Sequence, residues 1–419
     1  EPAGPADATT GPARALSDRG IRLFQQGRPA EALAAEQEAV TIYRRLAETH
    51  PDRYRPELAR SLQSLGFYLS ASGRTAEAIP VTQEAVAIYR ELDAAPDLAN
   101  CLFNLGDHLL GSGRPAEAVS VTQQAVAIYR ELVEADHDRY HPELARFLHG
   151  LGARLLESGR PAEAESAIKE AVAIRKYLAY DHPGRYRADL AASFSLLASA
   201  YRALQRPYEV VQAEERATDL YRELARIDRD RYRPELARAL SRLGAAHHDI
   251  GSQAAALSVR REAVKVYREL IDFYGELADF YPDRHIPDLA RALSDLDAAL
   301  QEVGRPAEAV PMLQHIVHDY RWLAERDPER YRQHLGMSLH RLGTALLESG
   351  SPDTALVAER EAVAIYRELA ETHPDRYRPE LARLLDGLGA IFEESGYLGK
   401  AEEAREEAAR IRGEDPGDR

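Results

Sequence analysis

Six arginines are the side chains best suited to binding chemistry, because they recur at the same place in six copies of a repeated segment. They are Arg14, Arg60, Arg146, Arg238, Arg291 and Arg383. A guanidinium group binds carboxylates and phosphates through two parallel hydrogen bonds, so this arginine ladder predicts a site for an acidic partner. The alternative is that each arginine pairs with an acid three residues earlier, as Glu57 precedes Arg60, and then contributes only about 0–1 kcal/mol.

No residue pattern predicts catalysis. Cys101 lies between leucine-type positions and is expected in the core rather than as a nucleophile. The Gly-Lys pair in 396–401 lacks the glycine spacing and the Ser or Thr of a phosphate-binding loop. Four histidines, a residue type that binds metals, lie close together in the sequence: His315, His318, His334 and His340. No acidic ligand motif accompanies them, so we expect no catalytic residue, no metal and no cofactor.

Composition narrows the function classes. The 419 residues carry 54 Lys plus Arg against 69 Asp plus Glu, a net charge of −15. This acidic balance argues against nucleic-acid binding, which depends on clustered positive charge. No apolar run approaches the roughly 18 residues needed to span a membrane, and one cysteine excludes an internal disulfide framework. We therefore expect neither nucleic acid nor membrane as a partner, and a cytoplasmic location.

Internal repeats explain how these side chains are positioned. The string from Ala47 to Arg60 recurs letter for letter from Ala370 to Arg383. One marker residue in each copy follows a near-constant leucine: Gly20, Gly66, Gly106, Gly152, Ala198, Gly244, Asp297, Gly343 and Gly389. The marker spacings are 46, 40, 46, 46, 46, 53, 46 and 46 residues. The chain is thus predicted to contain nine units.

Each unit is predicted to be a helical hairpin. A first helix is expected from Pro56 to Ser72, where leucines recur at helical spacing and Gly73 ends the helix. A second helix is expected from about Ala76 to Leu92, with one apolar stripe. The loop 49–53 then closes the unit. The fold class is all-α.

The pattern resembles the tetratricopeptide repeat (TPR) family, whose units place a Leu-Gly pair in the first helix and small residues at two positions in the second. The first small position, twelve after the marker, is Ala in eight units: Ala32, Ala78, Ala118, Ala164, Ala256, Ala309, Ala355 and Ala401. The second, seven later, is also Ala in eight: Ala39, Ala85, Ala125, Ala171, Ala217, Ala263, Ala362 and Ala408. The 46-residue period is similar to the long-helix subclass found in kinesin light chains.

The resemblance implies a right-handed superhelical solenoid whose first helices line a concave groove that binds peptides or partner proteins. The arginine ladder, six residues before the markers, should then face this groove. Other expected groove residues are Phe67, His149 and His340. They stand at positions that vary between units, where either specificity or simple drift of duplicated copies explains the variation.

An aromatic insert accounts for the 53-residue spacing. A seven-residue segment is copied in tandem at 269–275 and 276–282, nearly two helical turns, so the insert would lengthen the helix in register. Its aromatic side chains are Phe273, Tyr274, Phe280 and Tyr281. They form either a docking site for a partner or a contact with the neighbouring unit.

These observations predict a domain organisation and a function. We expect a disordered linker at 1–12, a nine-repeat array at 13–412 and a disordered tail at 413–419. The chain begins at Glu1 without methionine, so we expect a processed form or part of a longer protein. The predicted function is a non-enzymatic scaffold or sensor that binds a protein or peptide, an acidic one if the arginines are free. We expect it to belong to a larger bacterial signalling protein, with an NTPase or caspase-like domain in the same polypeptide.

Two alternative functions remain open at this point. The array could be structural, either assembling with itself or spacing other domains, although the charged end of the last unit disfavours stacking there. The histidine cluster could instead make the chain a metal-responsive regulator.

Overall fold

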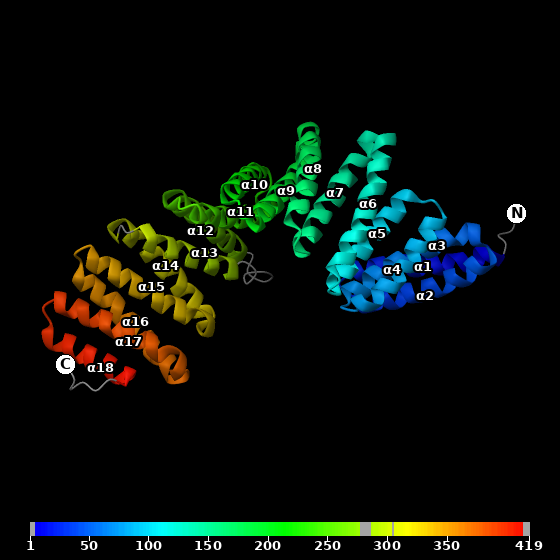
Figure 1. Cartoon of the computed structure of the whole chain (residues 1–419). Coiled ribbons are helices and arrows are strands. Elements are labelled where there is room, and N and C mark those ends of the chain that lie inside the picture. Colours follow the sequence, from blue (N-terminus) through cyan, green and yellow to red (C-terminus); the bar gives the residue numbers. More distant parts are fainter. Residues whose placement is uncertain (1–4, 277–285, 304–305, 414–419) are drawn as a thin grey trace. The chain divides into compact units, whose positions relative to one another are not determined.

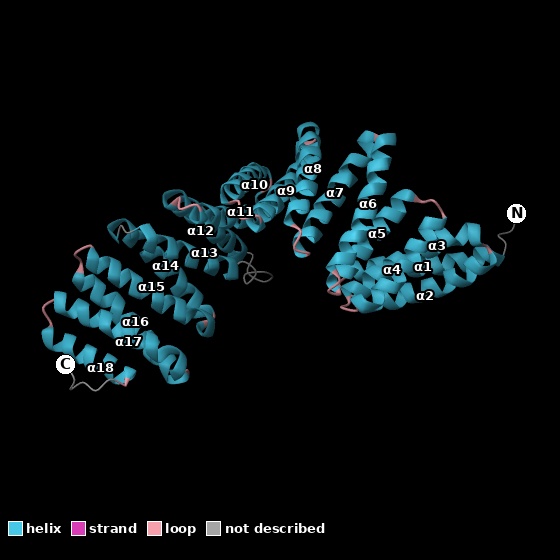
Figure 2. Ribbon diagram, in the orientation of Figure 1, coloured by secondary structure: helices cyan, strands magenta, loops and turns pink. Residues whose placement is uncertain are grey.

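The computed structural model describes residues 5–276, 286–303 and 306–413, and within them it describes side chains for 11–270, 288–296 and 309–413. These residues form two compact units, Glu1–Leu220 and Tyr221–Arg419. All the regular structure in the described ranges is α-helical (Figures 1 and 2). The predicted all-α repeat fold is confirmed.

The first unit contains nine helices and the start of a tenth. They are α1 (Pro5–Gln25), α2 (Pro29–Thr49), α3 (Pro51–Ala71), α4 (Thr75–Glu91), α5 (Ala95–Gly111), α6 (Pro115–Ala135), α7 (His137–Glu157), α8 (Pro161–Asp181), α9 (Pro183–Ala203) and α10 (Pro207–Ile227). Odd-numbered helices are the first helices of the hairpins and even-numbered helices are the second. Each helix packs mainly against its neighbours in the chain, as the hairpins in Figure 1 show.

The second unit continues the same alternation. Its helices are the end of α10, then α11 (Arg229–Asp249), α12 (Gln253–Glu276), α13 (Ile286–Val303), α14 (Pro306–Arg326), α15 (Pro328–Glu348), α16 (Pro352–Thr372), α17 (Pro374–Glu394) and α18 (Leu398–Arg412). Helix α12 is described as far as Glu276 and has 24 residues where most helices have 21, while residues 277–282 of the insert lie outside the described residues. At the 40-residue spacing, α4 and α5 have only 17 residues each.

The first helices begin earlier than the sequence predicts. Helix α3 starts at Pro51, not Pro56, and Pro56 lies inside it. Pro51 occupies the first turn, where a missing N–H has no intrahelical partner to lose. Pro56 is only five residues further on, so the start at Pro56 and the loop at 49–53 were wrong.

Glycine ends the helices as predicted. Gly73 has φ +76° and Gly159 has φ +71°. Both lie in the left-handed region, which glycine adopts without steric cost because it has no Cβ. The corresponding residue after α9 is Gln205, which adopts φ +57° in the same kind of turn. This turn therefore carries backbone strain that the glycine turns avoid, as does the turn at Asp93, with φ +54°.

The first and last helices do not begin and end at the predicted domain boundaries. Helix α1 begins at Pro5, within the expected linker 1–12, although the side chains of residues 5–10 lie outside the described part. Gly413 caps α18, and the rest of the expected tail, 414–419, lies outside the described residues. The division into linker, array and tail stays a prediction.

Close helix approach explains the small residues of each hairpin. Ala78 and Ala85 of α4 are fully buried, and the other alanines at these positions in the first unit are buried too. The marker glycine of the first helix faces a side chain of the second helix, sixteen residues later. A Cβ at Gly106 would stand 2.7 Å from Oγ1 of Thr122, and one at Gly343 would stand 2.8 Å from Oε2 of Glu359. The glycine thus makes room for the side chain at this position.

Ion pairs connect successive second helices and form a second-helix ladder. In the first unit, Arg44 pairs with Glu84 at 2.6 Å and Arg130 with Glu170 at 2.7 Å. The ladder continues in the second unit with Arg222–Glu262, Arg268–Asp319, Arg321–Glu361 and Arg367–Glu407. Most of these pairs repeat because the arginine and the acid recur at equivalent places in their units, although Asp319 lies four residues beyond the equivalent place and Arg90 bonds Gln124 instead.

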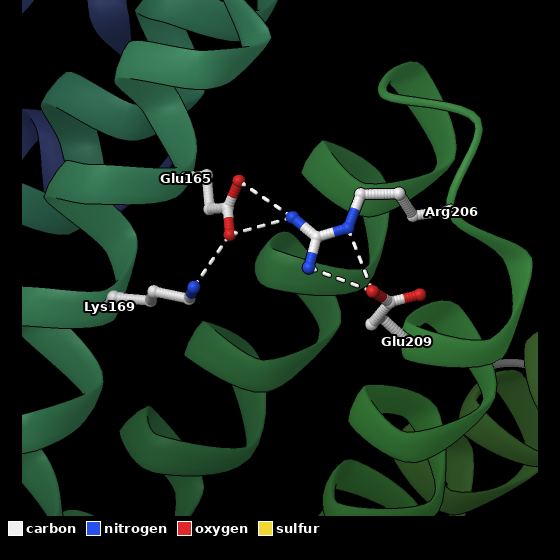
Figure 3. Close-up of polar contacts among 4 residues, drawn as sticks. All are labelled: Glu165, Lys169, Arg206 and Glu209. Atoms are coloured by element: carbon white, nitrogen blue, oxygen red, sulfur yellow. Dashed lines mark hydrogen bonds and ion pairs between the residues drawn. The ribbon is translucent and has the colours of Figure 1, made fainter.

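The joint between α8 and α10 uses a different network, shown in Figure 3. Its ladder positions hold Lys176 and Arg216, two like charges. Here Arg206, in the turn before α10, bonds both Glu165 of α8, at 3.0 Å, and Glu209, at 2.8 Å. Lys169 adds a 2.6 Å bond to Glu165. Glu165 therefore replaces the ladder pair as the acid that joins these two second helices.

Candidate functional site

Two adjoining cavities lie on the first helices of the first unit, and we call this surface the first-helix face. The polar cavity, about 450 Å³, lies between α1, α2 and α3. Its lining includes Arg14, Ser17, Asp18, Glu36, Tyr43, Arg53, Tyr54, Glu57, Arg60 and Ser61. Two members of the arginine ladder, Arg14 and Arg60, thus meet at one cavity. The surface is built to bind polar groups of both charges.

The aromatic cavity, about 430 Å³, continues the same surface onto α5. Phe67 is 48% exposed and its ring lies 5.1 Å from that of Phe24, edge to face. Tyr68 and Asn104 also line this cavity, while Ile21, Arg60 and Ser64 line both cavities. An exposed aromatic pair beside a polar cavity is typical of a surface that takes one apolar side chain of a partner.

Most of the arginine ladder is paired with acids. Arg60 pairs with Glu57 at 2.7 Å and Arg146 with Glu143 at 2.8 Å. The same arrangement holds for Arg238 with Glu235 (2.5 Å), Arg383 with Glu380 (2.8 Å) and Arg291 with Asp288 (3.9 Å). Arg146 also lies over the ring of Phe147, 4.6 Å from its centroid. The expected intrahelical pairs are therefore formed, and a role of the arginines in binding stays a proposal.

The two predicted histidines are held by internal contacts. His149 of α7 lies 3.2 Å from Arg175 and 3.3 Å from Ser193. Burial, and secondarily the charge of Arg175, lower the pKa of His149 to about 4. His340 of α15 contacts the buried carboxylate of Glu359 through Nδ1 at 2.7 Å. Both histidines lie on first helices, but these contacts engage them within the fold.

Buried acids are the functional side chains that the sequence reasoning missed. Glu36, Glu214 and Glu359 are each at most 1% exposed and occupy the position sixteen after the marker. Burial raises the pKa of both Glu36 and Glu359 above the ordinary value. An acid within an otherwise apolar stripe, at a constant offset from the marker, was the signal that could have found them.

A buried arginine reaches between neighbouring first helices. Arg154 of α7 is 2% exposed and bonds Asp107 of α5 at 2.6 Å. Its guanidinium lies 4.0 Å from the ring centroid of Phe103. Burial lowers the pKa of Arg154 despite the opposing effect of Asp107. The ion pair and the ring contact both join α7 to α5, so this geometry supports a structural role for the arginine.

The described part of the chain gives little support for a reactive thiol, a metal site or a membrane-spanning helix. Cys101 is fully buried, and burial raises the pKa of its thiol to about 12. The described residues contain no group of three or more His, Cys, Asp or Glu side chains able to hold a metal. None of the described helices combines the length and apolarity required to cross a membrane. The aromatic insert, Phe273, Tyr274, Phe280 and Tyr281, lies outside the residues whose side chains are described.

Comparison with known families agrees with the repeat geometry. Models described as tetratricopeptide repeat match residues 57–131 and, separately, residues 13–52, 144–184 and 335–375. No curated protein matches the chain.

Several solved structures are similar to parts or all of the chain. One is of kinesin light chain TPR-like repeats from Podosopora anserina, with 24% identity and a TM-score of 0.44 over 51% of this chain and 98% of that one. Another is BtubC (BKLC) from P. vanneervenii, with 19% identity and a TM-score of 0.38 over 60% and 91%. A third is aspartyl phosphate phosphatase F from Bacillus subtilis, with 13% identity and a TM-score of 0.44 over 97% and 95%.

Proposed function

Because the chain is an array of tetratricopeptide repeats, we propose that it is a non-catalytic protein-interaction scaffold whose first-helix face binds an extended segment of a partner protein. The observation that carries the site is the pair of adjoining cavities on α1, α3 and α5. Together they offer an exposed aromatic ring, Phe67, beside a polar pocket. An extended segment can place successive side chains into two such neighbouring cavities.

Arginines without an internal ion pair would favour a partner segment that carries acidic groups. Arg60 already pairs with Glu57, so an acidic group would have to displace that carboxylate. Arg14 has no ion pair within the described part of the chain and is the ladder arginine most open to an acid. The acidic class therefore depends on one arginine at this face, and it must be tested against other charges.

A photo-crosslinker at Gln63 tests the binding face directly, because Gln63 lines the aromatic cavity. The control is the same crosslinker at Thr41, an exposed residue of the second helix α2. We expect discrete partner adducts from residue 63 in host lysate and none of these from residue 41. Identical adducts from both positions would refute the assignment of the face.

A matched pair of aromatic substitutions gives an independent check. Phe67→Ser removes the exposed ring of the cavity, and Tyr180→Ser removes an 87% exposed ring from the second helix α8 of the same unit. We expect the first change, and not the second, to abolish recovery of the crosslinked partner. Equal recovery from both variants would place the binding surface elsewhere.

We further propose that the array is the partner-binding or sensor region of a larger cytoplasmic bacterial signalling protein. The support for this is the repeat family, and the NTPase or caspase-like domain is an expectation from the sequence alone. The complete open reading frame that encodes this chain tests it: a frame that encodes no such domain would contradict the proposal. Cell fractionation would test the location.

A further inference from the structure

The carboxyl group of Glu36 is the least expected feature of the first-helix face. It is on the second helix α2 and is 1% exposed, yet it lines the polar cavity. Oε1 accepts hydrogen bonds from Ser17 at 3.0 Å and Ser61 at 2.5 Å. Oε2 has no hydrogen-bond partner among the described residues. A buried carboxyl with an unsatisfied oxygen is costly unless a donor reaches it.

No cation of the described chain supplies that donor. Arg60 is bonded to Glu57, and the guanidinium of Arg53 lies over the ring of Tyr54, 5.3 Å from its centroid. Among the residues whose side chains are described, the carboxyl group of Glu36 bonds only the two serine hydroxyls. Both serines line the cavity too, so a ligand that displaces either hydroxyl from Oε1 would reach the carboxyl group.

The equivalent acid of another repeat differs in the chemistry of its partner, although its Oε2 likewise has no hydrogen-bond partner among the described residues. Glu359 occupies the same position in its unit and is also fully buried. There His340 contacts Oε1 of the carboxylate at 2.7 Å. At the residue that corresponds to His340, the first unit has Ser17, a neutral hydroxyl. The first unit thus has the same buried acid but lacks a histidine that could become cationic beside it.

We propose that the polar cavity binds a cationic group, a lysine or arginine side chain of the partner segment, on Glu36, while an apolar side chain of the same segment enters the aromatic cavity. This deepens the proposed function and rests on it. The two cavities share Ile21 and Ser64, so neighbouring side chains of one extended segment can reach both. A charge-assisted hydrogen bond from the ligand satisfies the carboxyl, which is worth more in a buried site than at the surface.

The proton of Glu36 should be linked to binding. The charged or titratable groups that face it are Arg14 and Asp18 on α1, Tyr43 on α2, and Arg53, Tyr54, Glu57, Arg60 and Tyr68 on α3. Burial raises the pKa of Glu36, and the hydrogen bonds from Ser61 and Ser17 lower it in part. A cation favours the ionised carboxylate, so binding releases a proton and affinity rises with pH through this pKa.

Three small probes that share one phenyl ring test the charge of the ligand: 4-phenylbutylamine, 4-phenylbutanol and 4-phenylbutanoate. Dissociation constants are measured by NMR titration against the full chain. We expect the amine to bind at least about fivefold more tightly than the alcohol and the carboxylate. Equal affinities, tighter binding of the carboxylate, or no binding of the amine at millimolar concentration would each overturn the proposal.

Two glutamine variants locate the effect. Glu36→Gln should reduce the preference for the amine over the alcohol to within about twofold, and Glu359→Gln should leave it unchanged. An unchanged preference in Glu36→Gln would overturn the assignment of the cation to this residue. Circular dichroism serves as the control that both variants keep the helix content of the wild type.

The pH dependence of the wild-type chain tests the same idea without any substitution. The affinity for the amine should fall as the pH is lowered through the pKa of Glu36, and the affinity for the alcohol should stay constant. A pH-independent amine affinity would overturn the proposal. Amine binding together with no crosslinked partner at residue 63 would refute the proposed function alone, and the reverse pattern would refute the cation site alone.

Discussion

The carboxyl group of Glu359 fills the space that Gly343 leaves open in the facing helix. A Cβ at Gly343 would stand 2.8 Å from Oε2 of Glu359. The same relationship joins Gly106 to Thr122 and Gly244 to Arg260, each at 2.7 Å. The marker glycine and the residue sixteen positions later are therefore one structural pair, repeated along the array with different chemistry at its second member.

The pair predicts the cost of filling a marker glycine. Gly152→Ala would bring a Cβ within 3.0 Å of Cδ1 of Ile168, a fully buried β-branched side chain with little freedom to move. We expect this change to destabilise the first unit by roughly 1–3 kcal/mol in urea denaturation. The control is Gly184→Ala in α9, where no atom lies within 4 Å. A loss of stability as large in the control would contradict the explanation.

The missing ladder pair predicts a stabilising substitution. Lys176 and Arg216 occupy the places where other joints hold an arginine and an acid. Arg216→Glu should create a pair with Lys176 and raise the free energy of unfolding by about 0.2–1 kcal/mol at low salt, with the gain shrinking in high salt. Arg202→Glu makes the same charge change at an exposed residue of α9 and should show no such gain.

The strained turn at Gln205 predicts a second stabilising change. Gln205 has φ +57°, whereas Gly159 in the corresponding turn has φ +71°. Gln205→Gly should stabilise the first unit by about 0.5–1 kcal/mol, because it removes the left-handed penalty of a residue with a Cβ. The reciprocal change Gly159→Gln should destabilise it by a similar amount. Thermal unfolding midpoints of the two variants measure both effects, and shifts of the same sign would count against them.

The buried Glu36 predicts a pH-dependent stability difference. Burial raises its folded pKa above the ordinary 4.5, so the folded chain holds the proton more tightly than the unfolded chain does. Ionisation of Glu36 therefore does not affect the free energy of unfolding below the unfolded pKa. It lowers this free energy increasingly as the pH rises from the unfolded pKa through the folded pKa. The stability of Glu36→Gln relative to wild type should increase over that window. Glu48→Gln, an exposed acid on the same helix, is the control in denaturation series at several pH values.

Cys101 predicts a local reporter of unfolding. It is the single cysteine of the chain, it is fully buried, and burial raises its thiol pKa to about 12. Because the thiolate is the reactive form, we expect a maleimide to label the native chain at least about a hundredfold more slowly than the chain in denaturant. Rapid labelling of the native chain would show that the α4–α5–α6 region opens readily.

Much of the fold could be predicted from local sequence patterns. Apolar spacing, the repeated alanines and the turn glycines such as Gly73 are local signals, and each acts within one hairpin. The start of α3 was missed because Pro51 and Pro56 are both acceptable near a helix beginning, and only the completed packing of Tyr54 and Leu58 favours the earlier one.

The sequence by itself determined the number of units, their helical hairpins and the recurrence of the arginines, because these depend on a period that is visible along the chain. Only the tertiary structure decided what those side chains do. Arg60 is bonded to Glu57, whereas Glu36, from the second helix, reaches the cavity of the first helices beside Gly20. Helix packing in three dimensions sets the burial of these side chains, their hydrogen-bond partners and the contacts among α1, α2 and α3. The spacing of residues within one helix does not determine these contacts.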